Sequence, residues 1–256
     1  MRVPASFCGL YGIRPTHGRL DFAGITVQAP DSDTVGWFAR DAGIFARIGE
    51  VLFGSTCPAD LPTRLVVATD AFGFADPAVA EALQPLLDRL TRLLGSRQEQ
   101  VMAPPGLSTW QHAQRTLQSS QAWQTFAPWL DSANPRLAFS VARNLVIASM
   151  ITDAERTRAA LVRMEARARL RYLLSPGTIL CLPTTPFPAP LRGLPLSTLN
   201  LLRERISCLT SHGGLTGVPQ VSIPGAKVDG APVGLSIIGA PGTDLALLSV
   251  ARALAA

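Results

Sequence analysis

Residues 217–239 read GVPQVSIPGAKVDGAPVGLSIIG, and this stretch decides the fold. Two apolar runs with valine and isoleucine, 217–225 and 231–239, flank the residues AKVDG. The pair Asp229-Gly230 is typical of a two-residue hairpin turn, because both residues accept the positive φ angles that such a turn requires. The stretch therefore predicts an antiparallel β-hairpin.

Further apolar runs predict two buried strands and a closing helix. TRLVVAT at 63–69 and GTILCLPT at 177–184 have the length and composition of buried strands, and the second runs into a proline-rich loop. TDLALLSVARALA at 243–255 predicts a helix with Thr243 as its cap. This helix directly follows the hairpin.

The segment 41–54 predicts a helix after the turn-rich residues 1–36. Asp41 is a suitable N-cap and Gly54 a natural stop. An apolar stripe at helical spacing is typical of a buried helix face. The stripe consists of Ile44, Ile48, Val51 and Leu52.

Residues 76–95 predict a second helix, and residues 107–174 a longer helical region. Asp76 is the N-cap of the second helix, Pro77 fits its first position, and Pro85 is expected to kink it. The apolar stripe of this helix is Val79, Leu83, Leu86, Leu87, Leu90 and Leu94.

The order of these elements predicts an α/β fold in which a mixed β-sheet is flanked by helices, in a single domain over 1–256. Hydrophobic residues make up 47% of the chain and charged residues 16%. This composition supports a substantial core and excludes disorder as a global state.

The net charge of +5 comes almost entirely from arginine, since Lys227 is the one lysine among 23 basic residues. The charge is spread thinly, without a nucleic-acid-binding motif, so we expect no nucleic-acid partner. Arg156, Arg163 and Arg167 share one helical face, which predicts a solvated surface; an acidic partner is the alternative.

The cysteines and histidines indicate neither a metal site nor a disulfide framework. They are scattered, without a CxxC pair, at Cys8, Cys57, Cys181, Cys208, His17, His112 and His212. Isolated cysteines are typically small core residues, and their setting is expected to be a reducing cytoplasm. No apolar run reaches the roughly 18 residues that span a bilayer. We expect no cofactor, no metal and no membrane partner.

A search for catalytic groups finds no complete set. G-x-S-x-G and S-x-x-K are absent, and Lys227 lies near the hairpin turn, where an exposed lysine stays protonated and is a poor base. Cys8 could pair with His17 or His212, but its apolar neighbours favour a core thiol. His112 is expected at the surface. His212 lies in the glycine-rich TSHGGLTG, which favours the edge of a pocket over an ordinary loop.

Four pieces of the sequence resemble the amidase signature family of Ser–Ser–Lys amide hydrolases. RVPASFCGLYGIRPTHGR at 2–19 is similar to the end of the family's signature. DTVGWFARD at 33–41, LCLPTTPFPAP at 180–190 and the long stretch 215–254 are similar to its later segments. DTVGWFARD is most similar to the branch of indole-3-acetamide hydrolase-like amidases.

The resemblance implies that the catalytic groups are not in these residues. The family motif is G-G-S-[IV]-R-x-P-A, and residues 2–5 match its R-x-P-A end. This match puts Met1 one residue after the nucleophilic serine. The nucleophile, the bridging serine, the catalytic lysine and the oxyanion glycines would all precede it. We therefore expect an N-terminally truncated chain with an incomplete amidase-signature fold. We expect it to contain no catalytic residues and to be inactive alone.

Two origins of such a truncation are open. Met1 marks either a gene model opened at an internal start codon, which we favour, or a genuinely split or decayed amidase. In the first case the function is carboxamide C–N hydrolysis by the full-length protein, with a small-molecule amide as substrate. In the second, the chain is a non-catalytic remnant or binds a separately encoded N-terminal half.

The resemblance also implies a substrate side for the site. Residues 2–6 would buttress it, while the loop after the 177–184 strand and the turn 210–214 would face the acyl pocket; ordinary loop structure is the alternative. The candidate pocket residues are Arg2, Ser6, Thr184, Thr185, Thr210, Ser211, His212 and Gly213. Without the family's N-terminal strands and helices, strand edges and the apolar surfaces that helices would cover are expected to be exposed. We expect this exposure to make the chain prone to aggregation.

Overall fold

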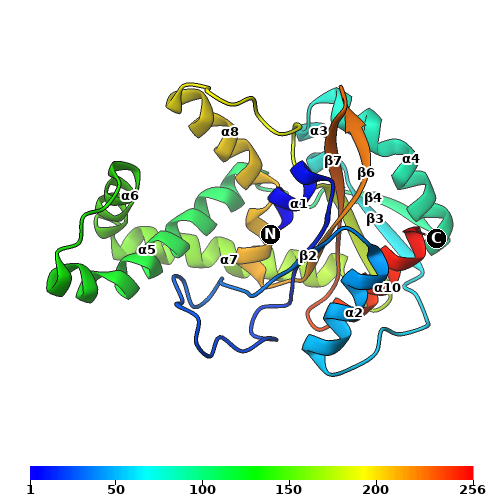
Figure 1. Ribbon diagram of the computed structural model, residues 1–256, viewed down its shortest axis with the longest axis horizontal. Helices are drawn as coiled ribbons and strands as arrows, with labels where there is room; N and C mark the ends of the chain where they lie inside the picture. Colours follow the sequence, from blue (N-terminus) through cyan, green and yellow to red (C-terminus); the bar gives the residue numbers. More distant parts are fainter. Residues whose placement is uncertain (256) are drawn as a thin grey trace.

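The computed structural model describes residues 1–255, which form a mixed seven-stranded sheet with helices on both faces (Figure 1). The strand order is β2-β1-β6-β7-β5-β3-β4. The strands are β1 (Tyr11–Arg14), β2 (Phe38–Ala39), β3 (Arg64–Ala68), β4 (Arg97–Gln100), β5 (Thr178–Pro183), β6 (Gln220–Val228) and β7 (Ala231–Ile238). The pairs of β3 with β4 and β5 are parallel, and the other pairs are antiparallel. The predicted fold class is confirmed.

Helices cover each face of this sheet. They are α1 (Arg2–Cys8), α2 (Ala42–Phe53), α3 (Thr69–Phe74), α4 (Pro77–Leu94), α5 (Leu107–Ala133), α6 (Phe139–Ser149), α7 (Asp153–Leu173), α8 (Leu196–Cys208), α9 (Ser211–Thr216) and α10 (Asp244–Ala255). In Figure 1, α2, α4 and α10 flank the sheet on one side, while α5 and α7 lie on the other. No helix within residues 1–255 is long and apolar enough to cross a bilayer.

The predicted hairpin is confirmed as β6 and β7. Asp229 and Gly230 have φ angles of 49° and 80°, as a two-residue turn of this type requires. The register pairs Val228 with Ala231, and a bulge interrupts it between Ile223 and Ala226. The hairpin forms the middle of the sheet, between β1 and β5.

Two apolar cores lie on opposite faces of the sheet, because successive side chains of a strand point in opposite directions. On β3, Leu65 and Val67 belong to the core under α2, α4 and α10. Val66 and Ala68 belong to the core under α5 and α7. This two-sided burial explains why the predicted strands read as continuous apolar runs rather than alternating ones.

The predicted bounds of α2 are confirmed, but of its apolar stripe only Ile48 packs against the core. Asp41 Oδ1 accepts the N–H of Ile44 at 2.8 Å, and Gly54 ends the helix with φ 63°. Ile44 is nevertheless 59% exposed and Val51 74% exposed. The other face packs against α10 so closely that a Cβ at Gly49 would overlap Leu248. The buried face instead carries Phe45 together with the small residues Ala42, Ala46 and Gly49.

The remaining predicted helices are present. All six stripe residues of α4 are buried, and Pro85 lies inside the helix. The region 107–174 forms α5, α6 and α7. Arg167 is exposed as expected, whereas Arg163 is partly covered and donates to Asp31 Oδ2 at 2.9 Å.

The four cysteines are free, and two of them match the expected core role. Cys181 and Cys208 are buried, and burial raises the pKa of both thiols. The expectation of a core position for Cys8 is wrong, because Cys8 is exposed at the end of α1. Ala5 and Ser6 are the buried residues of that helix.

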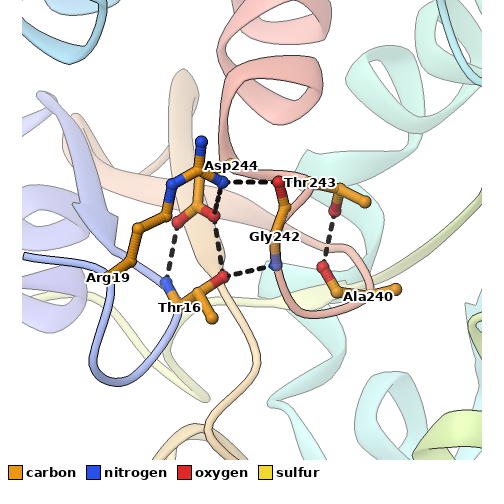
Figure 2. Close-up of polar contacts among 6 residues, drawn as sticks. All are labelled: Thr16, Arg19, Ala240, Gly242, Thr243 and Asp244. Atoms are coloured by element: carbon orange, nitrogen blue, oxygen red, sulfur yellow. Dashed lines mark hydrogen bonds and ion pairs between the residues drawn. The ribbon is translucent and has the colours of Figure 1, made fainter. Parts of the chain in front are cut away.

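A buried carboxylate joins the segment after β1 to the start of α10 (Figure 2). Asp244 is fully buried, and its carboxylate accepts the backbone N–H and the hydroxyl of Thr16, both at 2.7 Å, and a guanidinium N–H of Arg19 at 2.8 Å. The Thr16 hydroxyl in turn accepts the N–H of Gly242 at 2.9 Å. This Asp244 cluster fixes the RPTHGR segment, which begins with Arg14.

Figure 2 also corrects the predicted cap of α10. Thr243 holds the cap position, since its carbonyl accepts the N–H of Leu247 at 3.1 Å. Its hydroxyl, however, donates to the carbonyl of Ala240 at 2.7 Å. The side chain of Thr243 therefore braces the preceding turn rather than capping the helix.

Candidate functional site

The candidate pocket residues come from three parts of the chain that the fold brings together. Arg2 and Ser6 lie on α1, which packs against β6 and β7. Thr184 and Thr185 follow β5 in the sheet. The stretch expected to be a turn forms the short helix α9, with Thr210 at its N-cap position.

Ser6 and Thr185 meet in the interior. Both residues are fully buried, and their hydroxyl oxygens lie 3.1 Å apart. Ser6 Oγ accepts the N–H of Gly234 at 2.9 Å. A Cβ at Gly234 would lie 2.7 Å from Ser222 Oγ on β6 and 3.3 Å from Ser6 Oγ on α1, so the close packing at this point favours glycine.

A second set of hydroxyl groups crosses three strands. Thr184 Oγ1 lies 3.0 Å from Ser222 Oγ on β6 and 2.7 Å from Ser236 Oγ on β7. Gln220 Nε2 donates to Ser236 Oγ at 2.7 Å. All four side chains are fully buried, and each is satisfied by its neighbours.

Gln220 connects these hydroxyls to α1 and α9. Its Oε1 accepts a guanidinium N–H of Arg2 and lies 2.9 Å from His212 Nε2. Arg2 Nη1 also donates to the carbonyl of Thr210 at 3.0 Å. We call this set the Gln220 network: Arg2, Thr184, His212, Gln220, Ser222 and Ser236.

His212 lies inside this network, not at the edge of a pocket as expected. It is fully buried, and burial, with a smaller contribution from Arg2, lowers its pKa to about 3. The imidazole is therefore neutral. Because Gln220 Oε1 can only accept, the proton of His212 is assigned to Nε2.

Two buried guanidinium groups lie close together, that of Arg2 within the Gln220 network and that of Arg14 beside it. Burial, together with mutual repulsion, lowers the pKa of Arg2 to about 9. Burial also lowers the pKa of Arg14 to about 10, although Asp33 opposes the shift. Both side chains lie against α9, because a Cβ at Gly213 would lie 2.8 Å from Arg2 Nη1 and 2.9 Å from Arg14 Cδ.

A cavity of about 260 Å³, the Arg2–Arg14 pocket, opens beside these groups. Arg2, Thr210 and Ser211 line it, and Gly213 forms part of the helix behind it. Ser6, Thr184, Thr185 and His212 are fully buried away from its wall. The contact of any of these residues with an acyl group stays a prediction.

The pocket adjoins a larger groove of about 600 Å³ between α5, α6 and α8. Gln111, Arg115 and Gln118 line both spaces. Beyond them the groove is lined partly by apolar side chains, including Phe126 and Ile147. Arg115, Arg143 and Arg203 also line the groove, so arginines border the combined space at both ends.

Sequence reasoning missed several residues of the site. Gln220 and Ser222 alternate with apolar residues along β6, and this polar period of two was a usable signal for a shared, buried polar face. Ser236 on β7 pairs in register with Ser222. Arg14 gave no such signal, because its burial depends on the packing of α9.

The described residues hold no activated nucleophile. Among residues 1–255, no serine or cysteine side chain is hydrogen-bonded to a histidine or a lysine, and Lys227 is exposed. Within the same residues, no group of histidine, cysteine and acidic side chains could hold a metal ion. The site can bind and orient a ligand through hydroxyl, amide and guanidinium groups.

The fold and site define an α/β protein with a mixed sheet and a polar pocket beside its first helix. The family model named Amidase matches residues 1–248, and the chain therefore belongs to the amidase family. The resemblance inferred from the four sequence pieces is thus confirmed.

Relatives and a solved structure agree with this membership. The chain is 30% identical to "Amidase 1" of Oryza sativa subsp. japonica, with 99% of this chain and 65% of the relative covered. It is 29% identical to "Amidase 1" of Arabidopsis thaliana, with 100% and 67% covered. A crystal structure of an amidase matches with a TM-score of 0.84 at 26% identity, covering 100% of this chain and 60% of that one. The chain thus spans about two thirds of the length of these proteins.

Proposed function

We propose that these residues form the substrate-side portion of a carboxamide C–N hydrolase. The observation that carries the proposal is the Gln220 network, in which residues that the family resemblance places at the substrate side meet beside Arg2. The network holds α1, β5 and α9 in one arrangement. Its role would be to position the acyl end of a small amide, with an aliphatic or aryl acyl group.

We also propose that the 256 residues alone do not hydrolyse carboxamides. Serine attack in this family, as the resemblance implies, needs a lysine acting through a bridging serine, and the one lysine here is exposed in β6. His212 does not replace it, because its imidazole is buried and hydrogen-bonded to Gln220. Removing members of a catalytic triad typically lowers rates by several orders of magnitude.

A chimera tests the hydrolase portion directly. The part of the rice amidase that precedes its matched region would be joined to this chain, and ammonia release from simple carboxamides would be measured. We expect hydrolysis that falls at least tenfold in Gln220→Ala, while Asp88→Asn, an exposed change on α4, leaves it unchanged. A folded chimera without activity toward a panel of aliphatic and aryl amides would contradict the proposal.

The proposal also covers the cellular compartment and the class of ligand. Four free cysteines favour a reducing compartment such as the cytoplasm. The thinly spread arginines, several of which are engaged in ion pairs, favour a small-molecule substrate over a nucleic acid. Salt-dependent retention on DNA at low ionic strength would argue against this part.

A second candidate function is a non-catalytic subunit that binds another polypeptide, such as a separately encoded N-terminal half. The observation that favours it is the exposure of large apolar side chains on α6 to α8 and the adjacent loop. They include Phe139, Val146, Met150, Met164, Leu191 and Leu201. Exposed apolar side chains that gather into a patch often mark interfaces. Co-expression with the N-terminal segment of the rice amidase as a separate chain, followed by size-exclusion chromatography, distinguishes a stable pair from two independent proteins.

A further inference from the structure

A long irregular loop between β1 and β2, residues 17–35, has both ends fixed to the body of the protein. We call it the strap; in Figure 1 it is the blue loop below α5 and α7. At one end, Thr16 belongs to the Asp244 cluster. At the other, a Cβ at Gly36 would overlap the carbonyl oxygen of Ile13, so the backbone there is held closely. Between these anchors the strap contains neither a helix nor a strand.

The far end of the strap, residues 28–33, is a compact turn that we call the tip. Asp33 Oδ2 accepts the backbone N–H groups of Gln28 and Ala29 at 2.7 and 2.8 Å. The carbonyl of Ala29 accepts the N–H groups of Ser32 and Asp33, both at 2.9 Å. Because these bonds lie within the tip, we expect the tip to move as one body.

The tip forms one wall of the Arg2–Arg14 pocket. Ser32 lines the pocket, and Gln28 lines the adjoining groove. Directly after the tip, Thr34 Oγ1 accepts Arg14 Nη1 at 3.2 Å. Burial lowers the pKa of Arg14, and Asp33 of the tip opposes this shift. Movement of the tip away from the body would therefore widen the pocket and remove one of the covers of Arg14.

One exposed ion pair is the main polar contact between the tip and the helices. Arg163 on α7 donates to Asp31 Oδ2 at 2.9 Å, and the backbone N–H of Asp31 donates to Gln121 Oε1 on α5 at 3.1 Å. The hydrogen bond from Arg163 holds the pKa of Asp31 below its usual range. The side chain of Asp31 is 51% exposed, and ion pairs at such exposure are weak and screened by salt.

These features are typical of a loop that opens and closes. Gating loops have exposed backbone and few buried apolar contacts, so they open at a small cost in free energy. Within residues 21–31 only Ala29 is buried. Gly24 has a φ of 78° and no atom within 4 Å of its Cβ position, so the chain has room to turn there. We propose that the strap gates the Arg2–Arg14 pocket, with the ion pair of Asp31 and Arg163 as the latch whose release opens it.

Hydrogen exchange on the 256-residue protein tests the latch and does not depend on hydrolysis. Asp31→Asn and Arg163→Gln each remove one charge of the pair. We expect the protection factors of the amides in residues 28–34 to fall about twofold to fivefold, as for an exposed ion pair. Arg167→Gln, at an exposed position on the same face of α7, should leave them unchanged. Unchanged protection in both latch variants would overturn the proposal.

An exchange of charges separates the latch from an unrelated structural effect. Asp31→Arg combined with Arg163→Asp reverses the pair but keeps its opposite signs. We expect this double variant to recover protection to within about twofold of the parent protein, while each single reversal puts like charges together and opens the strap further. A double variant as unprotected as the single reversals would contradict a latch formed by this pair.

The reactivity of Arg14 tests whether an open strap uncovers the pocket. The probe is phenylglyoxal, which modifies accessible guanidinium groups, applied as a short pulse and mapped by mass spectrometry. We expect Arg14 to be modified about twofold to fivefold faster in Asp31→Asn, with the exposed Arg92 on α4 unchanged as the internal reference. An opened strap with unchanged reactivity of Arg14 would show that the strap is a surface loop and not a gate.

Discussion

At the residue scale, Asp244 is the side chain on which the segment after β1 most depends. Its buried carboxylate has three donors, from Thr16 and Arg19 (Figure 2). Asp244→Asn keeps the size but puts an amide group where only acceptors fit, so we expect a loss of about 2–3 kcal/mol in the free energy of unfolding. Urea denaturation measures it. Asp88→Asn, at an exposed position of α4, is the matched control, and equal effects of the two changes would contradict the assigned role.

Also at the residue scale, His212 is expected to make the stability of the fold depend on pH. Burial holds its folded-state pKa at about 3, whereas an unfolded histidine titrates near 6.5. The unfolded state therefore binds a proton first as the pH falls, and stability is lost progressively from about pH 6.5 toward pH 3. We expect the NMR signal of the His212 ring to stay unshifted between pH 8 and pH 5. A midpoint near pH 6.5 would show that the ring is solvated.

At the element scale, the close packing of α9 against Arg2 and Arg14 can be tested by substitution of Gly213. Gly213→Ala places a methyl group within 3 Å of Arg2 and Arg14, while nothing lies within 4 Å of a Cβ at Gly73 in α3. We expect Gly213→Ala to lower the melting temperature by several degrees. Gly73→Ala should be neutral or slightly stabilising, because alanine favours helix. A neutral Gly213→Ala would mean that α9 packs less tightly than described.

The element scale also shows what the sequence predicts and what it does not. Caps, glycine stops and apolar periodicity were sufficient for α2, α4, β3, β5 and the β6–β7 hairpin, because these signals are local. The buried face of α2 was not predictable in this way, since it depends on the contact of Gly49 with Leu248. The short helices α1 and α9 and the edge strands are stabilised by tertiary contacts, which a propensity pattern does not contain.

The candidate site, like the fold, was predictable from the sequence only in part. The family resemblance identified residues that do converge, from α1, the end of β5 and α9. It did not indicate that Gln220 connects them, nor that Arg14 is buried beside Arg2. Both facts depend on which face of a strand or helix meets a neighbour, and one residue of register decides that.

At the scale of the whole molecule, the surface predicts self-association. The sheet edges are short or polar, since β2 has two residues and β4 reads RQEQ, so they contribute little to it. The exposed apolar side chains of α6 to α8, including Phe139 at 77% and Met150 at 73%, provide the sticky surface instead. We expect concentration-dependent oligomers by analytical ultracentrifugation, reduced in Phe139→Ser with Met150→Ser. A monomeric, sharply melting protein would contradict this expectation.

The central proposal is that residues 1–255 form the substrate side of an amidase and hold no activated nucleophile. The most direct measurement is ammonia release from a simple carboxamide by the purified 256-residue protein, with its mass verified and host enzymes excluded. The account predicts no turnover above the rate without protein, because no serine or cysteine within residues 1–255 has a histidine or lysine as a hydrogen-bond partner. Sustained hydrolysis that follows the concentration of this protein would contradict it.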